Sequence, residues 1–220
     1  MPGLADVLTC RALDVAPRLL GSTLSHSDDQ GKVTVRITEV EAYMGEADPA
    51  SHAFKGPTPR NEVMFGKAGR LYVYLSYGAH WCCNVVTGTE GHPSAVLLRA
   101  GTVIEGVDLA RRRRGAQVVD RALARGPGCL GQALGLSREH DGVDLLESHH
   151  LRLRAGEPIE RERIASGPRV GVTLAHDFPW RFWVAGDATV SSYKPSPRAG
   201  LSRRSFYDES ERAARREHEK

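Results

Sequence analysis

The spacing of apolar and polar residues predicts a helix at the start of the chain and strands after it. Residues 4–20 carry leucines and valines near helical spacing, and GSTL then leads into an expected turn at 25–32. Residues 33–43 alternate between two faces, which is typical of a strand. Residues 44–69 are rich in glycine, proline and aspartate and predict a long loop, and long loops are often functional.

Strand signals continue in the middle of the chain. LYVYLSYGAHWCCNVVT at 71–87 holds two aromatic and β-branched runs around a Ser-Tyr-Gly-Ala centre, and therefore predicts a β-hairpin. SAVLLRA at 94–100 is continuous enough for a strand buried on both faces. Later segments predict helices at 106–114 and 126–136, and strands at 150–156, 168–174 and 181–186.

These elements follow no regular βαβ rhythm, which argues against a doubly wound parallel sheet. We expect a mixed α/β (α+β) fold, with one domain at residues 1–192 around a curved antiparallel sheet and a projecting hairpin. Residues 193–220 are charged and poor in apolar side chains, so they are expected to form a flexible tail.

Composition excludes several classes of protein. No apolar run approaches the roughly 20 residues that span a bilayer, and the first residues do not resemble a secretory signal, so we expect a cytosolic protein. The formal net charge of +3 is compatible with nucleic-acid binding without requiring it. The four cysteines form no CxxC pair and the histidines form no metal motif, so we expect no disulfide framework and no metal.

Two glutamates stand out in the strand at 33–43. Alternation puts Glu39 and Glu41 on the same face as Val33, Val35 and Ile37. A carboxylate on an apolar face costs several kcal/mol unless it is paired or faces a cleft. One interpretation is a general base at a pocket. On the strand alone, a strand end that simply becomes solvated is the commoner alternative.

Aromatic residues near these glutamates favour a pocket for a planar ligand. Tyr43 follows on the same face, and His52 lies in the loop that must fold back near it. The hairpin adds Tyr74, and Tyr72 for which ordinary cross-strand packing is the preferred interpretation. Tyr77 sits at the hairpin tip, and apolar wedges that enter DNA have this character.

The chain resembles the alkyladenine (3-methyladenine) DNA glycosylase family of the vertebrate type, which also occurs in bacteria. The stretches that carry the resemblance occur in order over roughly residues 10–192: EVEAYMGEADPASHAFKGPTPRNEVMF, GRLYVYLSYGAHWCCNVV, AVLLRAGTVIEG, GPGCLGQALG and PRVGV. Ala79 and His80 beside the tip depart from the vertebrate pattern.

The resemblance implies a role for individual residues. Glu41 would activate the water, with Arg99 beside it, while Glu39 has no established catalytic role. Tyr77 would fill the gap in the duplex, and Arg60 and Gly128 would contact the DNA backbone. The base pocket would be formed by Tyr43, His52, Tyr74, Asn84, Ala42 and Leu97.

The resemblance also implies an activity. The protein would flip out alkylated or deaminated purines (3-methyladenine, 7-methylguanine, hypoxanthine, ethenoadenine) from double-stranded DNA and leave an abasic site, as a monomer without a cofactor. One alternative is a non-catalytic nucleic-acid binding domain of the same fold. Another is a bifunctional enzyme that attacks through Pro2 after removal of Met1, although the zinc finger of such enzymes is missing.

Two basic or glycine-rich motifs remain open. GPGCLG at 126–131 matches GxGxxG formally, which alone would suggest a nucleotide-cofactor oxidoreductase. A phosphate contact at a helix N-terminus and a plain Gly-Pro turn are the other interpretations, and the turn is favoured. RRRRG at 111–115 predicts either a phosphate contact or, preferably, a solvated face.

Overall fold

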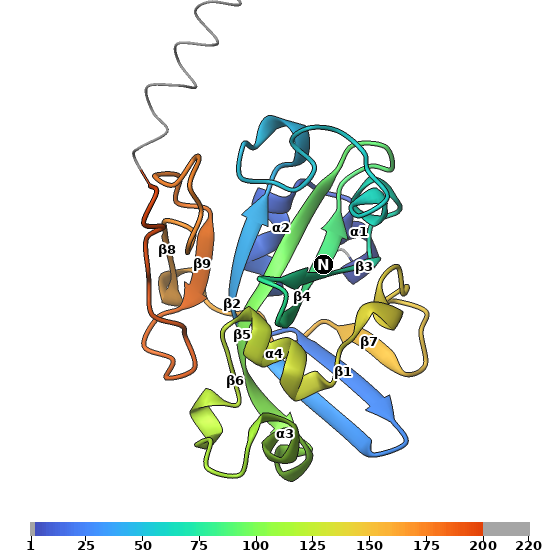
Figure 1. Ribbon diagram of the computed structural model, residues 1–220, viewed down its shortest axis with the longest axis vertical. Coiled ribbons are helices and arrows are strands. Elements are labelled where there is room, and N and C mark those ends of the chain that lie inside the picture. The colour runs from blue at the N-terminus through green and yellow to red at the C-terminus, as the bar shows by residue number, and fades with distance from the viewer. Residues whose placement is uncertain (1–2, 200–220) are drawn as a thin grey trace, which may run out of the picture.

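The longest strands, β2 (Gly31–Tyr43) and β5 (Ser94–Glu105), pair antiparallel along most of their length and form the centre of the fold (Figure 1). The computed structural model describes residues 3–199. Within these residues, nine strands form one sheet whose main path is β3-β4-β5-β2-β1-β7. The remaining strands are β1 (Thr23–Asp28), β3 (Leu71–Ser76), β4 (His80–Thr87), β6 (Ala124–Arg125), β7 (Leu151–Arg154), β8 (Ile164–Gly167) and β9 (Arg181–Val184).

Every pairing between these strands is antiparallel, which confirms the predicted mixed α/β fold around an antiparallel sheet. The predicted hairpin is confirmed as β3 and β4, which pair from Leu71↔Val85 to Ser76↔His80. Strand β9 pairs with the part of β2 that carries Glu39 and Glu41. The site end of β2 is therefore flanked by β5 on one side and by β9 on the other.

The helices are short and amphipathic. In the view of Figure 1, α1 (Leu4–Leu8) and α2 (Ala12–Leu19) lie behind the strands, and α4 (Pro127–Leu134) lies in front of them. Helix α3 (Val107–Arg114) lies at the far end of β5. The predicted helix at 4–20 is wrong as one helix, because Thr9–Arg11 interrupt it. The predicted turn at 25–32 is confined to residues 29–30, because β1 continues to Asp28 and β2 begins at Gly31.

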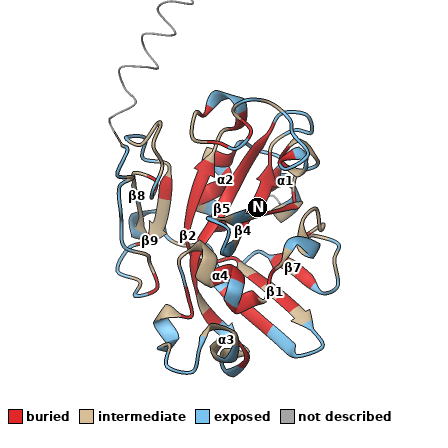
Figure 2. Cartoon of the chain, viewed as in Figure 1, coloured by how far each residue is buried: buried red, intermediate tan, exposed pale blue. Residues whose placement is uncertain are grey.

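The hydrophobic core gathers the apolar faces of these elements (Figure 2). Each fully buried leucine contributes about 1.5–3 kcal/mol relative to an exposed one. Helix α4 can approach the hairpin closely because it carries a glycine there, since a Cβ on Gly131 would lie 2.1 Å from the carbonyl oxygen of Trp81. Core side chains from the helices include Leu8, Val15, Leu19, Leu130 and Leu134.

The two glutamates do not continue the apolar face of β2, so the predicted alternation is wrong at this point. The core side chains on β2 are Val33, Val35 and Ile37, followed by Val40 and Ala42. The register of β2 against β5 shifts on both sides of Glu39, as at a β-bulge. This irregularity reverses the phase of the strand and turns both carboxylates away from the core.

The segment 168–174 is not a strand, in contrast to the prediction. Its backbone is irregular, because the polar groups that would enter a ladder are used elsewhere. The Arg169 side chain is buried and bonds to Asp48, and the amide of Val170 donates to Glu41. The prediction for 44–69 holds, with only short 3₁₀ turns at Gly45–Ala47 and Glu62–Phe65. The domain boundary at 192 stays a prediction, and residues 200–220 of the tail lie outside the described residues.

Candidate active site

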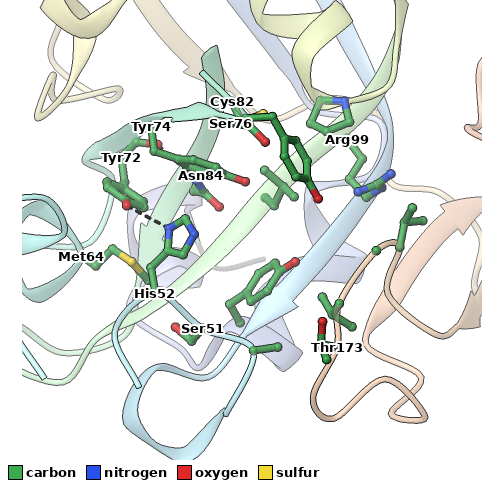
Figure 3. A pocket seen from close by; sticks show the side chains of 18 of the residues that line it. Ser51, His52, Met64, Tyr72, Tyr74, Ser76, Cys82, Asn84, Arg99 and Thr173 are labelled. Atoms are coloured by element: carbon green, nitrogen blue, oxygen red, sulfur yellow. Dashed lines mark hydrogen bonds between the residues drawn. The ribbon is translucent and has the colours of Figure 1, made fainter. Parts of the chain in front are cut away.

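A cavity of about 610 Å³ opens where the site ends of β2 and β5 meet the hairpin (Figure 3). Its walls come from β3 and β4, from the loop after β2, and from the segment around Val170. Among the predicted site residues, the cavity is lined by Tyr43, His52, Arg60, Tyr74, Tyr77, Asn84, Leu97 and Arg99. The structure therefore brings together residues spread over more than fifty positions of the chain.

Aromatic rings form one side of the cavity. His52 Nδ1 lies 3.0 Å from the hydroxyl of Tyr72, and its ring meets the ring of Tyr74 edge-on at 4.5 Å. The rings of Tyr72 and Tyr74 stack at 5.7 Å with 26° between their planes. Tyr72 is buried, as expected from cross-strand packing, yet it also holds His52 in place. Figure 3 shows these side chains gathered around one space.

The environment keeps these aromatic side chains uncharged at neutral pH. Burial raises the pKa of Tyr72 to about 12, and it raises the pKa of Tyr74 further. Burial, and then the charge of Glu41, raise the pKa of Tyr43 well above its ordinary value. His52 keeps an exposed edge at the cavity mouth, but the protein around its ring and the charge of Arg60 lower its pKa. Neutral rings present apolar faces to a ligand.

Glu41 lies behind the cavity wall and has no exposed surface. Its Oε2 accepts a hydrogen bond from the Tyr43 hydroxyl at 2.9 Å. Its Oε1 accepts one from the amide of Val170 at 2.7 Å and lies 3.3 Å from Arg99 Nη1. A carboxylate has about four acceptor positions, so these three partners leave room for one more donor.

Arg99 joins the two glutamates of β2. Its Nε donates to Glu39 Oε1 at 2.9 Å, while Nη1 faces Glu41. Glu39 also lies 3.3 Å from Arg181 Nη1 and accepts from the amide and the hydroxyl of Ser191. Burial opposes the charge of Arg99, but the two glutamates outweigh it and raise the pKa of Arg99. Both ion pairs of Arg99 are almost completely shielded from solvent.

Sequence reasoning missed Arg169, which contacts the end of β2 at Ala42 and Tyr43. Its guanidinium bonds to both oxygens of Asp48 at 2.5 and 2.9 Å and to the carbonyl of Ala42 at 3.0 Å. It lies 4.6 Å from the centre of the Tyr43 ring and 4.9 Å from that of Trp180. An arginine within PRVGV, a segment that read as a strand, was the only signal in the sequence.

Of the remaining predicted pocket residues, two line the cavity and one does not. Leu97 lines the cavity, and Asn84 does so with its amide nitrogen donating to the carbonyl of Tyr72 at 3.2 Å. Ala42 does not line it, which corrects the prediction, because the phase reversal points its side chain into the core. Its contribution is instead the carbonyl that Arg169 holds.

The hairpin tip is the most exposed aromatic position among the described residues. The Tyr77 side chain is 96% exposed, and the backbone φ is +50° at Tyr77 and +67° at Gly78. Positive φ at both central residues is the requirement of a type I′ turn, and the amide of Ala79 closes the turn on Ser76 at 3.0 Å. The turn therefore presents Tyr77 at the rim of the cavity, with almost no cover from the protein.

The two predicted backbone contacts lie on either side of the hairpin. Arg60 is exposed beside the cavity, and its Nη2 lies 3.5 Å from the carbonyl of Leu75. Gly128 lies in the first turn of α4, which packs on the hairpin, since a Cβ there would lie 2.7 Å from the Cβ of His80. Neither residue is buried, and their contact with DNA stays a prediction.

The two open motifs have structural roles. GPGCLG forms the Gly-Pro turn into α4, and the antiparallel sheet contains no parallel βαβ unit for a dinucleotide. Within RRRR, Arg111 pairs with Asp108 and Asp120, Arg113 pairs with Asp28, and Arg114 bonds to Gln132. Most of this run is therefore held within the protein, while Arg112 is exposed.

Across residues 3–199, no group of three histidine, cysteine or acidic side chains is placed to hold a metal ion, and the expectation of no metal stays a prediction. Over the same range, every helix is too short or too polar to cross a membrane.

Comparison with known proteins identifies the family. The family model described as methylpurine-DNA glycosylase (MPG) matches residues 6–188. A protein of Nocardia farcinica named "Putative 3-methyladenine DNA glycosylase" is 52% identical over 190 residues, which cover 84% of this chain and 88% of that protein. Proteins of the same name from Frankia casuarinae and Cutibacterium acnes are each 51% identical, over 84% of this chain and 90% and 96% of theirs. The chain thus belongs to the methylpurine-DNA glycosylase family and is a DNA glycosylase, a hydrolase of N-glycosyl bonds.

Proposed function

We propose that this enzyme removes 3-methyladenine and related damaged purines (7-methylguanine, hypoxanthine, ethenoadenine) from double-stranded DNA and leaves an abasic site for base-excision repair. The observation that carries the proposal is Glu41, a fully buried carboxylate paired with Arg99 behind an aromatic cavity. The names of the relatives support the substrate class.

A base can enter this cavity only after it has been flipped out of the duplex. An enzyme cannot reach the glycosidic bond of a stacked purine, and flipping costs a few kcal/mol, less for a weakly paired damaged base. The flipped base would lie between Tyr43 on one side and His52 with Tyr74 on the other. Methylation at N3 of adenine or N7 of guanine gives the base a positive charge, and a neutral aromatic face attracts a cation by about 0.5–2 kcal/mol.

Glu41 would act on the attacking water. Cleavage of the N-glycosidic bond passes through a cationic sugar, as in other glycoside hydrolysis. A carboxylate can take the proton of the water and also stabilise this cation. Because Tyr43 and Arg99 cover Glu41 from the cavity side, water reaches it only when one of them moves. We expect the Tyr43 hydroxyl to yield its place on Oε2 when a base stacks on the ring.

The DNA contacts follow from the exposed groups. Tyr77 would enter the space vacated by the flipped nucleotide. Arg60 and the N-terminal turn of α4 at Gly128 would contact phosphates, which fixes the enzyme on the backbone without reading sequence. Asn84 would crowd the pocket against normal guanine. We expect the enzyme to act as a monomer.

The reaction would be monofunctional, with water as the nucleophile. Pro2, the alternative nucleophile, lies outside the described residues. Reduction with borohydride during turnover should therefore trap no covalent adduct between protein and DNA. A trapped adduct that disappears on replacement of Pro2 would overturn this part of the proposal.

The decisive experiment compares Glu41→Gln with the wild type in single-turnover release of 7-methylguanine from a duplex. Loss of a general base predicts a decrease of about 100- to 10,000-fold, with duplex binding retained. Glu46→Gln, at an exposed glutamate in the turn that follows β2, is the matched control and should have the wild-type rate. Equal rates for Glu41→Gln and wild type would overturn the role of Glu41. An inert wild type that still binds lesion DNA would favour the non-catalytic binding domain.

The substrate range needs a panel of duplexes. Cationic 3-methyladenine and 7-methylguanine leave without protonation, whereas hypoxanthine and ethenoadenine are neutral and need acid assistance at the base. Release of the cationic bases should therefore persist at a higher pH than release of the neutral ones. Identical pH dependence for both groups would contradict a difference in leaving-group protonation.

A further inference from the structure

Glu39 is a buried charge that the reaction above does not use. Its side chain is 0% exposed and has four polar contacts: two with guanidinium groups and two with Ser191. Enclosing a carboxylate costs several kcal/mol before its contacts offset the loss of water. A strand that only needed to pack would carry an apolar residue at this point.

The contacts of Arg99 show what Glu39 does. All three guanidinium nitrogens are engaged: Nε with Glu39 at 2.9 Å, Nη1 with Glu41 at 3.3 Å, and Nη2 with the Ser191 hydroxyl at 3.3 Å. The Nε contact is the shortest of the three, and the fork of a guanidinium is rigid. Fixing Nε on Glu39 therefore fixes where Nη1 lies relative to Glu41.

The positive charge of Arg99 is shared between two carboxylates, Glu39 and Glu41. Four ionised side chains alternate in sign in the order Glu41, Arg99, Glu39 and Arg181. If Glu39 were neutral, the full charge of Arg99 would act on Glu41 alone. Arg99 would then stabilise the ionised form of Glu41 more strongly. The Glu41 carboxylate would have a lower affinity for a proton and would be a poorer proton acceptor.

The geometry assigns Glu39 as the positioning residue for Arg99, holding Nη1 against Glu41 and sharing the arginine's charge so that Glu41 can accept a proton from water. This assignment rests on the proposed function of Glu41. Glu39 itself would touch neither substrate nor water, since it lies on the far side of Arg99 and does not line the cavity.

The other groups around the two carboxylates come from β2 itself and from five further segments of the chain. Val170 donates its amide to Glu41, and Ser191 donates to Glu39. The ionisable or charged groups whose fields reach the pair are Arg99, Tyr43, Tyr74, Arg169 and Arg181. The rings of Trp183 and Tyr193 face Arg181 and carry no charge of their own at neutral pH.

The test is the pH profile of single-turnover release of 7-methylguanine by Glu39→Gln. This base needs no acid, so the acid limb of the profile reports the proton acceptor alone. We expect the plateau rate to fall about tenfold or more, and the acid limb to move toward lower pH by about one unit. Binding to a duplex with an abasic site should stay within about threefold.

Two further variants separate positioning from structural support. Ser191→Ala removes one contact of Glu39 and the Nη2 contact of Arg99, but it removes no charge, so its acid limb should not move. Arg181→Met leaves Glu39 to act on Arg99 alone, so its acid limb should move toward higher pH, opposite to Glu39→Gln. The Arg181→Met result decides the inference even if Glu39→Gln does not fold.

The outcomes are distinct. A Glu39→Gln enzyme with the wild-type rate and profile, or one that is slower with an unmoved acid limb, would overturn the inference, as would an unmoved limb in Arg181→Met. If the wild type is active and Glu41→Gln inert, these failures concern Glu39 alone. If the wild type releases no base, the proposed function and this inference fall together.

Discussion

The floor, by which we mean the buried layer behind the cavity that holds Glu39, Glu41 and Arg169, differs from the tip of the hairpin in almost every physical respect. At the floor, Glu39 and Glu41 have no exposed surface, and each has at least three polar contacts within the protein. At the tip, Tyr77 is 96% exposed, and a Cβ added to Gly78 would meet nothing within 4 Å. The floor holds its charges in fixed directions, whereas the tip has no cover of its own.

This difference indicates when each region acquires its partners. Fixed dipoles and charges at the floor are in place before DNA arrives, and preorganised groups need no rearrangement during the reaction. Under the proposed function, the tip would bury its aromatic ring only when it enters the duplex. Substitutions at the floor should therefore affect folding and chemistry, and substitutions at the tip should affect DNA engagement alone.

The largest effect on stability is expected for Arg169→Met, which removes the partner of the buried residue Asp48. Removing one partner of a buried pair leaves Asp48 charged and uncompensated, which costs about 3–5 kcal/mol. Denaturant unfolding should show this decrease in the free energy of unfolding, with loss of base release. The double variant Arg169→Met/Asp48→Leu should regain part of the stability, because no unpaired charge remains. Unchanged stability of the single variant would contradict the role of this pair.

Tyr77→Ala should break the tip without touching the floor. We expect single-turnover release from a duplex to fall about 10- to 100-fold, the equivalent of about 1–3 kcal/mol of lost stacking, at an unchanged melting temperature. Release from single-stranded DNA should change little, because no gap needs filling there. The control is Val119→Ala, which removes another exposed apolar side chain from the segment that follows α3. A lower melting temperature for Tyr77→Ala would argue that the tip packs within the protein.

Arg60→Ala should give a smaller effect on binding to the DNA backbone. Loss of one phosphate contact lowers the slope of log affinity against log salt concentration by about 0.9. Titrations of a lesion duplex at several salt concentrations measure this slope. Arg112→Ala, which removes an exposed arginine from α3, should leave the slope unchanged. Equal slopes for Arg60→Ala and wild type would remove Arg60 from the interface.

The smallest effect concerns a region that belongs to neither the floor nor the tip. His140 Nε2 lies 3.1 Å from Nε2 of buried His26, whose Nδ1 lies 2.7 Å from the carbonyl of Leu134. Burial and the neighbouring His26 lower the pKa of His140. The folded state therefore disfavours the charged form. Stability should be complete above the ordinary histidine pKa of about 6.5 and decrease as the pH falls below it.

Unfolding measurements at pH 7.5, 6.5 and 5.5 would test this pH dependence, with His140→Gln as the comparison that should flatten it. The cavity contains neither histidine. Acidification should therefore loosen this corner without changing the contacts of Glu41. A steeper decrease in His140→Gln than in wild type would contradict the assignment.

Sequence reasoning found the parts of the site that have local signals. The turn residues Tyr77 and Gly78, between two strand-like runs, predicted the hairpin. The carboxylates and aromatic residues around Glu41 and Tyr43 predicted a pocket. Alternation failed at Glu39, because a β-bulge depends on how β2 and β5 pair, and pairing is not a property of one strand.

Arg169 was missed for a related reason. Its partners are Asp48, the carbonyl of Ala42 and the rings of Tyr43 and Trp180, and most of them lie more than a hundred positions away in the sequence. The burial of an arginine can be predicted from the sequence only when its acidic partner is known. Ala42 was misplaced because its face follows from the same bulge.

The bulge at Glu39 also has a mechanical consequence. The end of β2 that pairs with β1 lies at the border of the fold, where twisting and fraying are easiest. A regular strand would transmit such motion along its length, side chain by side chain. Because the interruption at Glu39 is paired on both sides by β5 and β9, we expect it to separate the end of the strand that carries Glu41 from the outer end, so that the carboxylates keep their directions when the outer end fluctuates.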